Sequence, residues 1–294
     1  MPAEVSDEGS PEHYSTVATT YEGAFFYEDG SPYQQFLLEK TLLYLDLQKD
    51  DFLVDIGGGT GNFTEKVYRR THPSEPILVV DPFADMLEKA ERREGLRVLC
   101  KSAVDFAEET AEGRETETGK VKTTNSPGRD LQPSKVLMKE MIHHIAEEQY
   151  ERLFKGLLQK LKKSGQPRAR VVIMTRPKEV TYPFPSKAYK VFAENQPGAD
   201  RVCQAAASAG FFVKVFEEKY QASVPKEQWL QMIRVRFWST FSHAHFSEEE
   251  LEAGVKEVED KLKDKETADF DDTILFLVFS VREEKQKKSL CLIQ

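Results

Sequence analysis

Residues 52–63 read F-L-V-D-I-G-G-G-T-G-N-F, an apolar run that ends in a glycine-rich turn. Phe63 and Val67 follow at helical spacing, so the segment predicts a strand, a tight turn and a helix in succession. A doubly wound α/β fold binds its ligand where this first strand ends. Gly57, Gly59 and Gly61 allow the backbone to turn sharply and to approach a ligand that a Cβ would obstruct. An ordinary tight turn is the structural alternative.

Asp55, just before the turn, distinguishes between the ligands that such a turn binds. A dinucleotide would place its pyrophosphate beside this carboxylate, which would repel it. S-adenosylmethionine carries no phosphate, and a carboxylate attracts its ammonium group directly or through water. Asn62 also stands where the dinucleotide fingerprint has Gly or Ala. Both residues therefore favour S-adenosylmethionine over NAD.

Asp81 ends the next apolar run, V-V-D-P-F, twenty positions after Gly61. A carboxylate at the end of the second strand suits both hydroxyls of a ribose, and dinucleotide and S-adenosylmethionine sites share this feature. A helix N-cap is the structural alternative. Asp81 thus predicts a ligand that contains adenosine, and Asp55 predicts that this ligand is S-adenosylmethionine.

Short apolar runs alternate with amphipathic segments, a pattern typical of βαβ units and of a parallel sheet covered on both faces. We expect an α/β fold: a doubly wound, seven-stranded, mostly parallel sheet with helices on both faces and an antiparallel C-terminal edge strand. The expected strands are residues 52–56, 77–80, 96–99, 135–138, 169–174, 211–216 and 274–281, with a helix over 33–47 before them.

The chain divides by composition into a polar N-terminus, one domain and a basic tail. Residues 1–12 are expected to be disordered, residues 13–282 form the domain, and residues 283–294 form the tail. Within the domain, residues 107–134 offer almost no apolar side chains and predict a flexible insertion. Residues 223–265 predict a helical addition before the last strand.

This helical addition carries two local signals. Ser247-Glu-Glu-Glu250 is a capping box that predicts the start of a helix. An apolar stripe at four-residue steps precedes it and either lines a ligand pocket or belongs to the core; its members are Trp229, Ile233, Phe237 and Phe241.

Composition excludes several classes of protein. The 294 residues carry 50 acidic and 41 basic side chains, and the net charge of -9 disfavours a nucleic acid partner. Cys100, Cys203 and Cys291 show neither metal-ligand spacing nor a disulfide framework, so we expect no metal and a reducing cytoplasm. The N-terminus lacks the pattern of a signal peptide, and no apolar run approaches the roughly 18 residues of a membrane span.

Four segments resemble motifs of the class I, Rossmann-like, S-adenosylmethionine-dependent methyltransferases. D-I-G-G-G-T-G resembles their first motif and V-V-D-P-F-A-D-M-L their second. S-K-V-L-M-K-E-M-I-H-H-I is similar to the fourth-strand segment of a small-molecule branch that includes the quinone-biosynthesis C-methyltransferases, and H-Y-S-T-V-A-T-T-Y-E to the helix that covers the cofactor there. The resemblance spans roughly residues 13–220 and implies methyl transfer to a small-molecule acceptor.

The resemblance also implies a set of cofactor contacts. Asp81 would bind the ribose, Met86 would lie near the adenine and Lys139 would lie beside the cofactor. Ser102 departs from the family, which commonly has an acid facing the adenine amino group, and Ser102 or Asp105 would replace that acid. The implied cofactor residues are Asp55, Gly57, Gly58, Gly59, Gly61, Asp81, Pro82, Met86, Ser102, Ala103 and Lys139.

His143 and His144, just past the fourth strand, are the candidate catalytic residues. Methyl transfer is an in-line displacement that needs a general base only when the acceptor must lose a proton, and histidine can take one near neutral pH. The alternative is that both histidines cap or pack a helix start. Tyr14, Tyr21 and Tyr27, on the expected lid, either orient an acceptor or pack against the protein.

The segment K-E-M-I after the fourth strand lacks the Asp/Asn-Pro-Pro-aromatic turn of the enzymes that methylate nucleobase amines. Together with the acidic charge, this favours a small-molecule acceptor. Two alternatives remain: a methyltransferase-fold protein that binds cofactor without turnover, and an NAD(P)-dependent oxidoreductase, which Asp55 and Asn62 oppose.

The chain ends in Cys291-Leu292-Ile293-Gln294, which matches the C-a-a-X pattern for farnesylation, and Lys285, Lys287 and Lys288 lie just upstream. A lipid together with basic residues supports reversible membrane attachment. Coincidence is the alternative. We therefore expect a cytoplasmic enzyme that becomes membrane-associated if Cys291 is prenylated.

Overall fold

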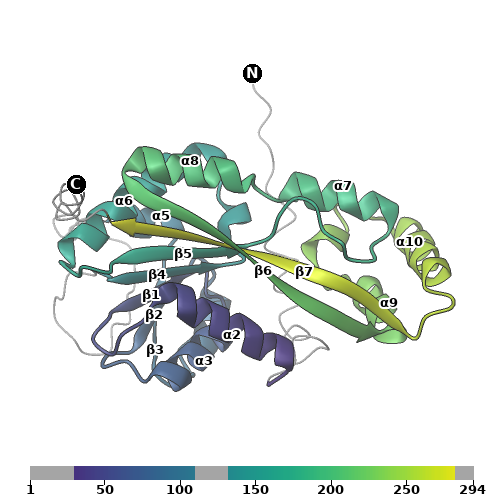
Figure 1. The fold of residues 1–294 in the computed structure, drawn as a ribbon, viewed down its shortest axis with the longest axis horizontal. Helices are drawn as coiled ribbons and strands as arrows, with labels where there is room; N and C mark the ends of the chain where they lie inside the picture. Colours follow the sequence, from purple (N-terminus) through teal and green to yellow (C-terminus); the bar gives the residue numbers. More distant parts are fainter. Residues whose placement is uncertain (1–29, 110–131, 282–294) are drawn as a thin grey trace, which may run out of the picture. The chain divides into compact units, whose positions relative to one another are not determined.

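A computed structural model of the chain describes residues 30–109 and 132–281. A seven-stranded sheet with the order β3-β2-β1-β4-β5-β7-β6 forms its centre (Figure 1). The strands are β1 (Leu53–Ile56), β2 (Ile77–Asp81), β3 (Leu96–Cys100), β4 (Lys135–Lys139), β5 (Arg170–Thr175), β6 (Phe211–Pro225) and β7 (Thr267–Val281). All seven expected strands are present, although β6 and β7 are longer than expected.

The strands β1 to β5 are parallel, and β7 pairs antiparallel with β5. The predicted fold class is therefore confirmed, including the direction of the C-terminal strand. Its position at the edge is wrong, because β7 lies between β5 and β6 and leaves β6 at the edge. The local pattern of a strand indicates its burial but not its neighbours, so the sequence does not reveal this insertion.

Helices cover both faces of the sheet. Val54 and Val80 belong to a core that includes buried side chains of α5, α6 and α8, whereas Val79 packs with Leu87 and Ala90 of α4. The helices are α2 (Pro32–Leu45), α3 (Asn62–Thr71), α4 (Ala84–Ala90), α5 (Ala103–Glu108), α6 (Tyr150–Lys163), α7 (Ser186–Asn195), α8 (Ala199–Ala209), α9 (Lys226–Arg234) and α10 (Glu248–Lys261).

The described residues form two compact units. The sheet unit comprises residues 38–109, 132–175, 198–216 and 275–281 and contains the parallel strands. The helical unit comprises residues 30–37, 176–197 and 217–274, and its aromatic core includes Phe184, Trp229 and Phe241. The predicted helical addition thus belongs to a larger unit, which also contains α7 and parts of β6 and β7.

The predicted insertion at 107–134 is too wide at both ends. Ala107 is buried within α5, and Ser134 is buried and donates a hydrogen bond of 2.6 Å to Asp51 Oδ1. In the sequence, polar neighbours obscure the two short buried stretches to which these residues belong. Residues 110–131 lie outside the described part of the chain, as do residues 1–12 and 283–294.

The predicted helical addition at 223–265 begins too early, since β6 continues to Pro225. The capping box is confirmed: Ser247 accepts from the Glu250 amide, and the Glu250 side chain accepts from the Ser247 amide. The apolar stripe does not lie on one helix, because α9 ends at Arg234 and Arg236 has a positive φ of 55°. All four members of the stripe are buried in the core of the helical unit.

None of the described helices combines the length and the apolar character needed to cross a bilayer.

Candidate functional site

The glycine turn after β1 adopts the backbone conformation that only glycine tolerates well. Gly57, Gly59 and Gly61 have φ values of 72°, 55° and 72°. A Cβ on Gly61 would lie 2.7 Å from Leu96 Cδ1, so this glycine permits close packing. A Cβ on Gly59 would meet no atom within 4 Å, so the backbone at Gly59 borders open space that a ligand can approach.

Asp81, at the end of β2, is bonded to this turn. Its Oδ2 accepts a hydrogen bond of 3.0 Å from the Gly59 amide, and its Oδ1 accepts one of 2.9 Å from the Phe83 amide. Burial raises the pKa of Asp81, while these two amides lower it. The N-cap of α4 is Phe83, so Asp81 does not cap that helix. Its carboxylate instead joins the ends of β1 and β2.

Asp55, at the third position of β1, is 2% exposed. Its Oδ2 accepts a hydrogen bond of 2.5 Å from Thr64 Oγ1, whereas its Oδ1 is buried and has no hydrogen-bond partner among the described residues. Burial raises the pKa of Asp55 to about 7, opposed by the Thr64 hydroxyl and the charge of Lys139 and reinforced by the charge of Asp81. A buried carboxylate oxygen without a donor is uncommon and indicates a missing partner.

The carboxyl end of β4 lies beside this carboxylate, because Asp55 pairs with Leu137 in the sheet register. The Lys139 ammonium lies 5.2 Å from the centroid of the Phe63 ring, and its charge lowers the pKa of Asp55. A Cβ on Gly57 would lie 2.7 Å from Met141 side-chain atoms. The structure thus brings the turn, Asp55, Asp81 and Lys139 together in the sheet unit.

Three further predicted cofactor residues follow the ends of β2 and β3 in the chain. Pro82 is exposed, and its carbonyl accepts a contact of 3.5 Å from Cys100 Sγ. Met86 is half-buried in α4, and Ala103 is buried in the first turn of α5. All three residues therefore belong to the same edge of the sheet as Asp81.

Ser102 is the N-cap of α5, a role that the sequence analysis did not assign to it. Its hydroxyl accepts a hydrogen bond of 3.1 Å from the Asp105 amide and donates one of 2.7 Å to Asp105 Oδ2. The hydroxyl proton is already donated, while Asp105 is exposed and retains a carboxylate oxygen for a further donor.

The two histidines after β4 differ in environment. His143 and His144 lie in a short 3-10 turn with ring centroids 4.0 Å apart. Burial, reinforced by the charge of His144, lowers the pKa of His143 to about 3, and its Nδ1 has no hydrogen-bond partner among the described residues. The expectation that either histidine takes a proton near neutral pH is therefore wrong for His143. His144 is exposed.

Several predicted residues lie outside the described ranges: Tyr14, Tyr21, Tyr27 and the C-terminal Cys291-Leu292-Ile293-Gln294. Thr64 was missed, although a threonine in the first turn of the helix after the glycine turn is a signal for a partner of Asp55. Within the described ranges, no group of three or more His, Cys, Asp or Glu side chains could hold a metal ion.

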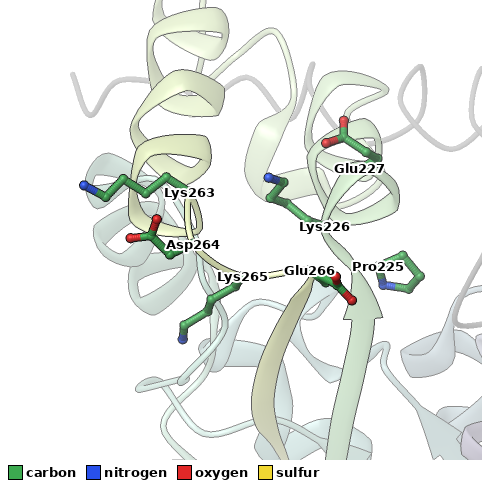
Figure 2. Close-up of a pocket in the computed structure, with 7 residues that line it drawn as sticks. All are labelled: Pro225, Lys226, Glu227, Lys263, Asp264, Lys265 and Glu266. Atoms are coloured by element: carbon green, nitrogen blue, oxygen red, sulfur yellow. The ribbon is translucent and has the colours of Figure 1, made fainter.

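The helical unit contains a surface hollow of about 530 Å³ (Figure 2). None of the predicted site residues lines it. Its lining consists of Pro225, Lys226, Glu227, Lys263, Asp264, Lys265 and Glu266. Lysine and acidic side chains alternate around this hollow, so it has no single charge preference.

No family model matches the chain, and no curated protein matches it. Among solved structures, it is similar to phosphoethanolamine N-methyltransferase 2 of Haemonchus contortus in complex with phosphomonomethylethanolamine and S-adenosylhomocysteine, with a TM-score of 0.53 and 15% identity. The match covers 93% of this chain and 58% of the Haemonchus chain, so this chain spans little more than half the length of that enzyme.

Two further structures match over nearly their full length. A methyltransferase from an antibiotic biosynthesis pathway of Anabaena variabilis, described as putative, has a TM-score of 0.54 at 14% identity and covers 84% of this chain and 97% of its own. The cyclase SpnF has a TM-score of 0.53 at 14% identity, with coverage of 92% and 95%. At these identities the similarity establishes the fold, which is that of the class I, Rossmann-like methyltransferases.

Proposed function

We propose that this chain, with its class I methyltransferase fold, transfers a methyl group from S-adenosylmethionine to a small-molecule acceptor. The observation that carries the proposal is the pair of carboxylates around one glycine turn. Asp81 is bonded to the turn at Gly59, and Asp55 presents a buried oxygen that has no donor. An adenosine with a cationic amino acid end matches both features.

The site fits S-adenosylmethionine better than a dinucleotide. The turn leaves space at Gly59 for a ligand, and the nearest charged groups at the ends of β1 and β2 are carboxylates. A pyrophosphate at the turn would be repelled by the Asp55 carboxylate, whereas Asp81 suits the ribose of either ligand. The ammonium of S-adenosylmethionine would instead supply the donor that Asp55 Oδ1 lacks, directly or through one water. This supports S-adenosylmethionine over NAD(P).

The remaining cofactor contacts follow from their places on the same edge of the sheet. Asp81 would bind the ribose hydroxyls with the lone pairs that Gly59 and Phe83 leave open. Asp105, held by Ser102, is the better acceptor for the adenine amino group. The backbone and side chains that would enclose the cofactor are Gly57, Gly58, Gly61, Pro82, Met86, Ala103 and Lys139.

When bound, S-adenosylmethionine supplies an activated methyl group. The protein's task is to align the acceptor and to exclude water, which accounts for much of the acceleration in displacement reactions. His143 is too weak a base to remove a proton at neutral pH, but its neutral Nδ1 can accept a hydrogen bond from an acceptor. His144, which is exposed, is the remaining candidate general base.

We propose a small-molecule acceptor because the net charge of -9 opposes nucleic acids. The Haemonchus N-methyltransferase, which is similar in fold, is in complex with a small molecule, phosphomonomethylethanolamine. We further propose that the protein acts in the cytoplasm. The roles of Tyr14, Tyr21 and Tyr27 and the lipidation of Cys291 stay predictions of the sequence, because these residues lie outside the described ranges. Membership of the quinone-biosynthesis branch stays a prediction.

A second candidate is a protein of this fold that binds the cofactor without methyl transfer, and the cyclase SpnF, to which the chain is similar, carries the name of a different activity. The fold alone does not select between the two, because the reaction depends on the acceptor half of the site. Tight cofactor binding with no methylated product across a broad acceptor panel would favour this candidate.

Calorimetry with S-adenosylhomocysteine tests the proposed function. We expect wild-type protein to bind and Asp81→Ala to bind about 100-fold more weakly, since two or more hydrogen bonds to a charged group are lost. Asp81→Asn, which keeps one acceptor oxygen, controls for collapse of the turn, and Asp85→Ala, an exposed residue in the first turn of α4, should match wild type. Binding of NAD(P) in place of S-adenosylhomocysteine would overturn the proposal.

A further inference from the structure

Thr64 is a buried polar residue that no expectation for the cofactor site includes. It lies in the first turn of α3, is fully buried, and its Oγ1 donates a hydrogen bond of 2.5 Å to Asp55 Oδ2. We propose that Thr64 is a positioning residue for the cofactor, whose hydroxyl holds one oxygen of Asp55 so that the other is presented to the cationic amino acid end of S-adenosylmethionine. This inference rests on the proposed function.

The two oxygens of Asp55 have different surroundings. Oδ2 accepts the hydrogen bond from the Thr64 hydroxyl and lies close to the backbone of Gly58. A Cβ added at Gly58 would lie only 2.9 Å from Oδ2, so no space is left on that side. Oδ1 has no donor among the described residues. Because the Thr64 bond fixes the orientation of the carboxylate, the incoming donor always finds Oδ1 in the same place, and less conformational freedom is lost on binding.

The groups that act on Asp55 come from three neighbouring elements. From α3, the Thr64 hydroxyl favours the carboxylate form; from β4, the charge of Lys139 does the same; from β2, the charge of Asp81 opposes it. Burial outweighs the effects of Thr64 and Lys139 and raises the pKa of Asp55 to about 7. The ligand-free protein at neutral pH is therefore a mixture of the protonated and ionised forms.

Binding a cation at Oδ1 stabilises the ionised form and shifts this mixture. The O–H bond of the protonated carboxyl group breaks, its proton goes to the buffer, and no covalent bond forms. Cofactor binding should therefore release a proton from Asp55, and the affinity should rise with pH up to about 7 and level off above it. Removing the Thr64 hydroxyl removes a group that favours ionisation, so more of the protein would begin in the protonated form.

Calorimetry with S-adenosylhomocysteine at pH 7, in two buffers with different ionisation enthalpies, measures the protons released. At a pH equal to the pKa, wild type should release about half a proton from Asp55, and about a tenth of a proton one pH unit above it. The ammonium of the ligand also titrates in the alkaline range, so proton counts are compared with those of Asp55→Asn at the same pH. If the pKa of Asp55 rises by about one unit, Thr64→Val should release close to one proton at pH 7 and bind about fivefold more weakly there, because the ionised fraction falls from about one half to about one tenth. Above the pKa the difference from wild type should narrow but persist, because the ionised carboxylate is then no longer held in one orientation.

Thr64→Ser is the matched control, because it keeps the hydroxyl and should keep the wild-type pH profile. Asp55→Asn removes the titrating carboxyl group and should release no proton at pH 7 or below, so its proton exchange at higher pH reports the amino group of the ligand alone. A wild-type affinity that is independent of pH, or equal proton release from Thr64→Val and wild type, overturns the role of Thr64 while leaving the proposed function intact. Absence of S-adenosylhomocysteine binding by wild type at every pH overturns the proposed function itself.

Discussion

The amide of Gly59 donates a hydrogen bond of 3.0 Å to Oδ2 of Asp81, and this bond joins two segments 22 residues apart. The turn after β1 and the carboxylate at the end of β2 are therefore one structural element. The conformation of Gly59 decides where its amide points, and Asp81 keeps it there. A substitution in the turn should act on ligand binding through both the free space at Gly59 and the position of Asp81.

Gly59→Ala should separate ligand binding from backbone strain when compared with Gly165→Ala. Both glycines have positive φ, 55° and 67°, and a Cβ at either would meet no atom within 4 Å. Each variant should lose about 1–2 kcal/mol of unfolding free energy. Only Gly59→Ala should weaken S-adenosylhomocysteine binding, by tenfold or more in calorimetry. Equal affinities for the two variants would contradict the placement of the ligand at Gly59.

The stability of the ligand-free protein should depend on pH through Asp55. Its pKa is about 7 in the folded protein and 3.8 in the unfolded chain, so the folded state holds a proton that the unfolded chain has lost. The tighter binding of this proton by the folded state adds to the free energy of unfolding. This contribution is complete below pH 3.8 and is lost as pH rises to about 7. From pH 5.5 to pH 8, urea unfolding should show wild type losing about 2 kcal/mol more than Asp55→Asn. Parallel profiles would argue against a raised pKa.

The helical unit should depend on a buried ion pair between Arg176 and Asp272. Arg176 Nε and Nη2 donate to the two oxygens of Asp272 at 2.8 and 2.9 Å. Burial alone would raise the pKa of Asp272, but Arg176 and the hydroxyls of Tyr182 and Tyr33 hold it below its ordinary value. Asp272→Asn should cost about 3–5 kcal/mol, because the guanidinium stays buried without a counter-charge.

Tyr33→Phe is the control for this ion pair. It removes one hydroxyl, which donates to Asp272 Oδ2 at 2.5 Å, and leaves the two charges together. We expect a loss of about 1 kcal/mol by chemical unfolding at pH 7. If both variants cost the same, the hydrogen-bond network rather than the charge pair carries the stability.

Gly156→Ala should destabilise the sheet unit, although alanine is ordinarily the better helix former by about 1 kcal/mol. A Cβ on Gly156 of α6 would lie 2.3 Å from the Ala107 carbonyl oxygen of α5, and neither backbone can yield easily. We expect a loss of 1–3 kcal/mol in thermal or urea unfolding. Gly254→Ala meets only the ring carbons of Pro185, at 2.9 Å, and should cost less. A stabilised Gly156→Ala would show that α5 and α6 can separate at this point.

The sequence alone determined the strand, turn and helix at 52–63 and the alternation that makes the sheet parallel. These features are local: a glycine that needs positive φ, a run of apolar residues and a period of 3.6 are visible within about ten residues. The places of Asp55 and Asp81 followed for the same reason, since the carboxyl ends of neighbouring parallel strands meet at one edge.

The tertiary structure decided which partners those residues have. The order of β7 and β6 depends on contacts between strands far apart in the chain, and Arg176 meets Asp272 across 96 positions. Asp55 is confined by Thr64 from the next helix, and this contact makes one oxygen different from the other. Burial of that carboxylate, which changes its ionisation, arises only when β2, β4 and α3 pack around β1, because low polarity is a property of the assembled core and not of any single segment.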